Sequence, residues 1–126
     1  MTSPLAPGLT ATVALAVTSA DTAIELGSGD VPVLATPRVV ALTEEATVAA
    51  IAPALQDGQT SVGTRVELDH KAATPVGRTV LATATLTEAD GRKLTFEVSL
   101  TDGETLAAQG VVHRVVVDRQ KFLDRL

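Results

Sequence analysis

The sequence predicts an α+β protein in which one long helix packs against an antiparallel sheet. Two observations carry this prediction. One stretch, between residues 36 and 55, has helical periodicity, and five stretches have the two-residue periodicity of strands, four of them after the helix. With 126 residues, 45% of them hydrophobic and 20% charged, the chain has the size and composition of one folded domain, which we expect over residues 1–126.

The predicted elements follow one another along the chain. Residues 9–17 alternate apolar with hydroxyl or small side chains, which indicates a half-buried strand. Thr36, followed by a proline, predicts a helix start with Thr36 as the N-cap, and the helical spacing of apolar residues continues to about Leu55. The four later strands are expected near residues 62–70, 80–86, 94–100 and 111–117, and an Asp-Gly pair between the second and third predicts a tight hairpin.

The composition argues against several classes of function. There is no cysteine and there are only two histidines, so we expect neither a metal site nor a bound cofactor. A net charge of −5 and the absence of Trp and Tyr argue against nucleic-acid binding. No apolar run is long enough to span a membrane, and the apolar stretch at residues 9–17 lacks the preceding basic residues of a signal peptide. We therefore expect a cytoplasmic protein without a membrane partner.

Three polar residues fall where the pattern predicts burial or confinement. Glu44 lies near the apolar stripe of the helix, although a surface glutamate at the edge of that stripe is an alternative. His70 ends a strand whose inward parity it shares with Val62, Thr64, Val66 and Leu68, and a core histidine that bonds a backbone carbonyl would do the same. Thr36 is explained by N-capping alone.

Together, these three residues suggest a catalytic site. A hydroxyl, a carboxylate and an imidazole could converge across one helix–sheet interface, where Glu44 would raise the pKa of His70 and orient its ring. His70 could then activate water or the Thr36 hydroxyl. Gly63 offers a backbone N–H for an oxyanion or carbonyl, with a bulge glycine as the alternative interpretation.

The remaining histidine and the basic residues are weaker candidates. We expect His113 and Arg114 to have a surface or interface role. A phosphate-bearing ligand would need a local basic island on this acidic chain. Its candidates are Arg65, Lys71, Arg78, Arg92 and Lys93, although each is also explained as an ordinary solvated charge.

Six segments carry a resemblance to a known family. They are Val33–Pro37, Ala41–Ala46, Ser61–Thr64, His70–Gly77, Asp90–Leu94 and Gly110–Arg114, and the most specific is His70-Lys-Ala-Ala-Thr-Pro-Val-Gly77. From about Gly8 to Phe122 the chain resembles the fluoroacetyl-CoA thioesterase-like branch of the hotdog-fold thioesterases. The resemblance implies a hotdog fold, in which a five- or six-stranded antiparallel sheet wraps one long central helix, and a homodimer with its active sites at the subunit interface.

The resemblance also implies roles for individual residues. The catalytic Thr, Glu and His of the family carry over to Thr36, Glu44 and His70, and Gly63 lines the acyl-thioester site. We expect Arg114, which matches the arginine of the family's Gly-x-His-x-Arg motif, and Lys71 to bind substrate.

Two departures from the family are visible. The stretch Ile24–Val33 has no aromatic residue where the fluoroacetyl enzyme closes its pocket with aromatics, which argues against fluoroacetyl selectivity. Val112 stands at the motif's histidine position, and His113 is one register step away, on the other face of the strand.

The function implied is hydrolysis of a small or medium acyl-CoA to the free acid and CoA. Three alternatives are compatible with the same fold. The chain could bind acyl-CoA without catalysis, hydrolyse an acyl group attached to a carrier protein, or act on the acyl chain as a dehydratase does.

Overall fold

The computed structural model describes residues 4–126 and confirms the α+β class. Its strands are β1 (Thr10–Ala16), β2 (Gln59–His70), β3 (Thr79–Asp90), β4 (Lys93–Asp102) and β5 (Thr105–Asp118). Its helices are α1 (Ala23–Leu26), α2 (Thr36–Ile51) and α3 (Arg119–Asp124), with short 3-10 turns η1 (Ser19–Asp21) and η2 (Ala52–Ala54). The strands form one antiparallel sheet in the order β1-β3-β4-β5-β2.

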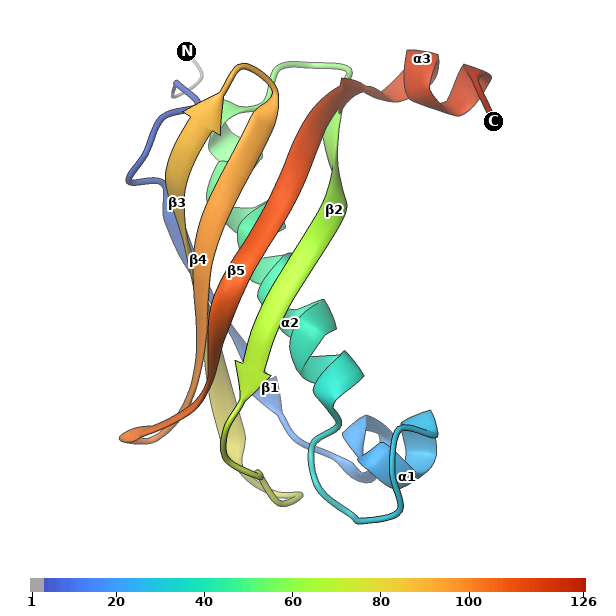
Figure 1. The fold of residues 1–126 in the computed structure, drawn as a ribbon, viewed down its shortest axis with the longest axis vertical. Coiled ribbons are helices and arrows are strands. Elements are labelled where there is room, and N and C mark those ends of the chain that lie inside the picture. Colours follow the sequence, from blue (N-terminus) through green and yellow to red (C-terminus); the bar gives the residue numbers. More distant parts are fainter. Residues whose placement is uncertain (1–3) are drawn as a thin grey trace.

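The curved sheet wraps α2, which runs along its inner face (Figure 1). The core lies between them. The helix contributes a stripe of buried residues at helical spacing: Val39, Leu42, Thr43, Ala46, Thr47, Ala50 and Ile51. The inner positions of β3 and β4 are buried as their alternation predicts: Val80, Ala82, Ala84, Leu86, Leu94, Phe96, Val98 and Leu100. Small helix residues at 46 and 50 allow the sheet to approach closely, which explains the alanine-rich composition of the helix.

The helix α2 begins one residue earlier than predicted. Ala35 is the N-cap and Thr36 is the first helical residue, and Thr36 makes no capping hydrogen bond. The predicted capping role of Thr36 is therefore wrong, and its hydroxyl is available for another partner. At the other end, α2 stops at Ile51 and continues as η2, where Pro53 cannot donate the hydrogen bond that an α-helix needs.

A β-bulge divides β2 into two halves, and the residues that face the helix alternate differently in each half. The pairing with β5 shifts register between Gly63 and Arg65. After the bulge, Val66, Leu68 and His70 are the less exposed residues, as predicted. Before it, Gly63 faces the helix, so the strict alternation predicted from Val62 to His70 is wrong for the first half of the strand.

The strand β2 forms one edge of the sheet. It pairs with β5 alone, and no strand within residues 4–126 pairs with its other edge. The adjacent exposed face of α2 includes Val48, which is 46% exposed. No helix within residues 4–126 has the length and hydropathy needed to cross a bilayer.

Candidate active site

Thr36 and His70 form the centre of the candidate site. The Thr36 hydroxyl oxygen lies 2.8 Å from Nδ1 of His70, a hydrogen bond between residues 34 positions apart. Thr36 is held by the first turn of α2 and His70 by the last position of β2. The two predicted residues therefore meet where the helix begins and the strand ends, in the geometry expected for a hydroxyl and its general base.

A pocket of about 310 Å³ opens beside this pair. It is formed by the segment before α2 and the residues after β2, and its lining includes Ser28, Gly29, Val33, Ala72 and Ala73 together with Thr36 and His70. None of the lining residues is Phe, Tyr or Trp. The pocket is thus open and lined mainly by small side chains.

Burial sets the protonation state of His70. It lowers the pKa of the ring below the usual 6.5, and the Ala72 backbone opposes this shift more weakly. Within the described part of the chain, Nε2 is buried and has no hydrogen-bond partner. Among residues 4–126, no carboxylate contributes to this shift, so the predicted effect of Glu44 on the ring does not arise within one chain. A neutral imidazole at neutral pH can accept the proton of a hydroxyl or a water.

Glu44 lies apart from this pair. It is eight positions after Thr36 on α2, a rise of about 12 Å along the helix. Its Oε2 is 3.3 Å from Nη1 of Arg114, and its side chain is 33% exposed. Within one chain, Glu44 therefore does not join the Thr36–His70 pair, because the helix rise separates the carboxylate from that pair; the prediction that the three residues share one site stays a prediction.

Arg114 is buried within the chain, so its expected place at the surface is wrong, while its expected interface role stays a prediction. It lies on β5 opposite Gly63 and is only 7% exposed. Its Nε donates to Ser61 Oγ (2.8 Å), its Nη2 donates to the Ser61 backbone carbonyl (3.0 Å), and its Nη1 donates to Glu44. Burial lowers the pKa of Arg114 and Glu44 raises it, and an arginine remains charged under both influences.

Gly63 faces the Glu44 carboxylate. A Cβ at position 63 would overlap Oε2 of Glu44 and would lie 3.4 Å from Nη1 of Arg114. Gly63, Glu44, Arg114 and Ser61 thus form a second cluster, which we call the Glu44 cluster. The sequence provided a signal for each member, but it did not indicate that Ser61 anchors the arginine.

The other candidates lie outside both groups. Lys71 is exposed and lines the pocket beside His70. Val112 is fully buried in the core, and His113 has its Nδ1 3.3 Å from the Thr95 hydroxyl. His113 therefore does not replace the family's motif histidine. Among residues 4–126, no group of three His, Asp or Glu side chains could hold a metal ion.

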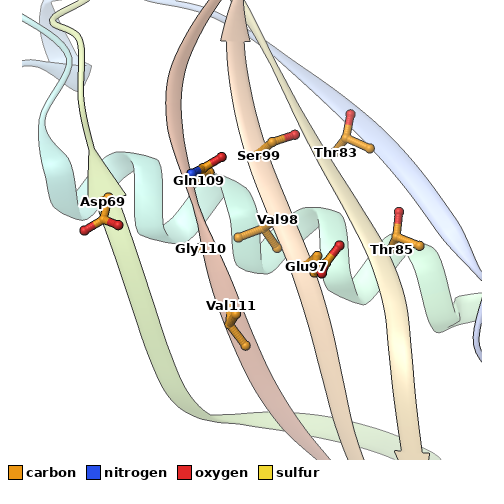
Figure 2. Close-up of a pocket in the computed structure, with 9 residues that line it drawn as sticks. All are labelled: Asp69, Thr83, Thr85, Glu97, Val98, Ser99, Gln109, Gly110 and Val111. Carbon is orange, nitrogen blue, oxygen red and sulfur yellow. The ribbon is translucent and has the colours of Figure 1, made fainter.

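A larger depression, of about 500 Å³, lies on the sheet away from Thr36 and His70. Figure 2 shows that its polar side chains project from the face of the sheet opposite α2. They come from four strands and include Thr83, Thr85, Glu97, Ser99 and Gln109. This depression does not touch either candidate group.

The fold is that of the hotdog proteins. A hypothetical protein of Thermus thermophilus, described as a thioesterase superfamily member, is 26% identical with a TM-score of 0.90, over 97% of this chain and 90% of that one. A hot-dog-like protein from Thermanaerovibrio acidaminovorans is 23% identical with a TM-score of 0.87, over 94% of this chain and 88% of that one, and has the same fold. The predicted hotdog architecture is confirmed, with five strands.

Within this class, the chain belongs to the family of fluoroacetyl-CoA-specific thioesterases, whose model matches residues 17–120. The fluoroacetyl-CoA thioesterase of Streptantibioticus cattleyicolor is 43% identical over 90 residues, which are 71% of this chain and 65%, less than two thirds, of that protein. A crystal structure of a fluoroacetyl-CoA thioesterase is 34% identical with a TM-score of 0.91, over 98% of this chain and 96% of that one. A mutant of that enzyme in complex with fluoroacetate and CoA is 35% identical with a TM-score of 0.87, over 94% and 99%.

Proposed function

We propose that the protein hydrolyses small or medium acyl-CoA thioesters to the free acid and CoA. The observation that carries this proposal is the 2.8 Å hydrogen bond between Thr36 and His70 at the edge of an open pocket. Membership of a thioesterase family supports the same reaction. The pocket lining of small, non-aromatic residues favours a range of acyl groups over selectivity for fluoroacetyl.

His70 acts as the general base in this proposal. Its neutral Nδ1 takes a proton from a water held by Thr36, and the resulting hydroxide attacks the thioester carbonyl carbon. The tetrahedral intermediate then collapses, the carbon–sulfur bond breaks, and the imidazolium returns its proton to the CoA thiolate. In the alternative route the Thr36 oxygen attacks first and forms an acyl-enzyme, which water hydrolyses in a second step. Trapping of an acyl group on Thr36 distinguishes the two routes.

We further propose a homodimer that completes this site with the partner's Glu44. The free edge of β2 and the exposed Val48 beside it support pairing with a second copy. Two antiparallel copies of β2 paired around a point between Val66 and Glu67 would place Gly63 of one copy opposite His70 of the other. The Glu44 cluster of one subunit would then face the Thr36–His70 pair of the other.

Lys71 is proposed to contact a phosphate of CoA, since its exposed side chain lies at the pocket beside His70. Lys71→Gln should raise KM for acyl-CoA and leave KM unchanged for the matching acyl-pantetheine, which has no phosphate. An equal change for both thioesters contradicts this contact.

The single domain over residues 1–126 and the cytoplasmic location stay predictions. The first three residues lie outside the described part, and cell fractionation tests the location.

A panel of acyl-CoA thioesters tests the proposed reaction. Thiol release is measured with acetyl-, fluoroacetyl-, butyryl-, hexanoyl- and longer acyl-CoA, each with the matching acyl-pantetheine. We expect turnover of several small or medium acyl groups, with fluoroacetyl-CoA not strongly preferred. Tight binding of acyl-CoA without thiol release would favour the non-catalytic alternative, and turnover confined to acyl-carrier-protein substrates would favour the second alternative.

The titration of His70 tests whether a carboxylate from the partner reaches the ring. In Glu44→Gln, burial outweighs the weaker opposing effect of the Ala72 backbone, so the pKa of His70 should lie below 6.5. In the wild type, the partner's carboxylate favours the imidazolium and should place this pKa above that of the variant. The acid limb of kcat/KM should move in the same direction. Two-dimensional NMR over pH 4.5–8 measures the titration of His70 in the wild type and in the variant. The signals of the second histidine are assigned with His113→Ala. Identical titrations in wild type and variant contradict the shared site.

A further inference from the structure

We propose that Asp21 is a positioning residue: together with Arg38, it holds the first turn of α2 so that the Thr36 hydroxyl stays directed at His70. The inference rests on the proposed hydrolytic function, in which Thr36 and His70 act as a pair. Neither Asp21 nor Arg38 lines the pocket beside that pair. Their effect on the reaction therefore passes through Thr36 and not through contact with the substrate.

The start of α2 lacks the usual side-chain cap. Its N-cap is Ala35, which has no polar side chain, and Thr36 makes no capping hydrogen bond. The first four N–H groups of an α-helix have no partner inside the helix, and helix ends open more readily than helix centres. The Thr36 hydroxyl oxygen nevertheless lies 2.8 Å from Nδ1 of His70. Keeping this distance requires a restraint from outside the helix.

Asp21 supplies such a restraint on both sides of Thr36. Its backbone carbonyl accepts a hydrogen bond from the N–H of Ala35, directly before Thr36, at 2.9 Å. Its Oδ1 accepts a hydrogen bond from Nε of Arg38, two residues after Thr36, at 3.0 Å. One residue outside the helix thus holds the chain just before and just after the threonine.

Asp21 is itself fixed to the end of the sheet. Its Oδ2 accepts hydrogen bonds from the backbone N–H (2.8 Å) and the hydroxyl (3.2 Å) of Thr18. The neighbouring Val17 donates its N–H to the carbonyl of Arg78, directly before β3. The backbone N–H of Thr18 is the main cause that lowers the pKa of Asp21 below 3.8, so the carboxylate is charged at neutral pH. The carboxylate therefore links the sheet to the first turn of α2.

Two other roles of the Asp21–Arg38 pair predict different results. A pair that stabilises the fold and does nothing else would change thermal unfolding, but not the Thr36–His70 bond of the folded protein. An arginine that binds a phosphate of CoA would, when removed, raise KM for acyl-CoA and leave KM for acyl-pantetheine unchanged. A positioning pair should lower kcat, because a displacement of about 1 Å at a reacting group can lower turnover about 100-fold.

Asp21→Asn and Arg38→Met are the test variants, each alone and combined with Thr36→Val. Asparagine keeps one oxygen for Thr18, but its NH2 group cannot accept a hydrogen bond from Arg38. We expect each single variant to lower kcat about 10–100-fold, with KM for acyl-CoA and acyl-pantetheine within about twofold of wild type. In the Thr36→Val background, neither should lower the remaining kcat further, because the hydroxyl that they position is gone.

Asp102→Asn is the matched control. The side chain of Asp102 is 14% exposed, close to the 12% of Asp21, and it is paired with an arginine, Arg78, at 3.1 Å. Asp102 ends β4 and does not line the pocket beside His70. Its variant should therefore keep kcat within about twofold of wild type. A loss of kcat in this control as large as that of Asp21→Asn would overturn the proposal.

NMR spectra of the His70 ring nitrogens give a readout that needs no turnover. Thr36→Val removes the hydroxyl bonded to Nδ1, so its spectrum defines the ring without this bond. Asp21→Asn and Arg38→Met should shift the Nδ1 signal toward that of Thr36→Val, and Asp102→Asn should not. Because the Arg38 side chain is 31% exposed, Arg38→Met keeps the proposal testable if Asp21→Asn does not fold.

Two results would overturn the positioning role. One is a wild-type Nδ1 signal in the folded variants, and the other is a main effect on KM for acyl-CoA. A wild type inactive on every thioester would instead refute the proposed function, and the NMR spectra would still decide whether Asp21 and Arg38 position Thr36.

Discussion

His70→Ala should lower kcat/KM for the best acyl-CoA substrate by at least about 100-fold, and by as much as about 10⁴-fold, the range that a general base typically contributes. The physical reason is that the variant lacks His70 Nδ1, which lies 2.8 Å from the Thr36 hydroxyl oxygen and is the proposed acceptor of the proton. The fold should persist, because the lost ring makes one side-chain hydrogen bond and its buried Nε2 has no partner among residues 4–126. Thiol release and thermal unfolding measure the two effects.

His113→Ala is the matched control for this experiment. It removes the other histidine of the chain, whose ring contacts Thr95 and lies outside the pocket. We expect activity within about twofold of wild type for this variant. If His70→Ala kept its activity within a few-fold on every cleaved thioester, the assignment of His70 as the base would be wrong.

Mixing two inactive variants should restore activity if the site is shared between subunits. In a heterodimer of His70→Ala with Glu44→Gln, one site combines Thr36 and His70 of the second subunit with Glu44 of the first, and it is complete. Random exchange of equal amounts makes about half of the dimers mixed, so about one quarter of wild-type activity should return. The measurement is thiol release after co-refolding or co-expression, compared with each variant alone.

The control pairs His70→Ala with Thr36→Ala. These residues are hydrogen-bonded within one chain, so neither site of the mixed dimer is complete and no activity should return. Recovery in this control would mean that Thr36 and His70 act from different subunits. A monomer by light scattering, or no recovery in the first mixture, would contradict the shared site.

Much of the framework was predictable because it rests on local periodicity. The alternation in β3 and β4 identified every one of the core positions from Val80 to Leu86 and from Leu94 to Leu100. The helix was predictable from its spacing, although its N-terminal boundary shifted by one residue. That small shift mattered, because it changed the Thr36 hydroxyl from a supposed cap into a partner of His70.

The arrangement of the polar residues was only partly predictable. The inward facing of His70 followed from the alternation of the second half of β2, but the bulge between Gly63 and Arg65 reversed the facing of the first half. A single extra residue in a strand leaves almost no signal in its composition. The burial of Arg114 within the chain was not predictable for a similar reason, since nothing in its neighbourhood along the chain reveals the Ser61 anchor 53 residues away.

The sequence by itself determined the class of fold, the buried faces and the identity of the polar residues, because periodicity and residue type are properties of short segments. Only the tertiary structure decided which of those residues meet. It joined Thr36 to His70 and Glu44 to Arg114 in two separate groups, because helix rise, strand pairing and the bulge set distances between segments that are remote along the chain.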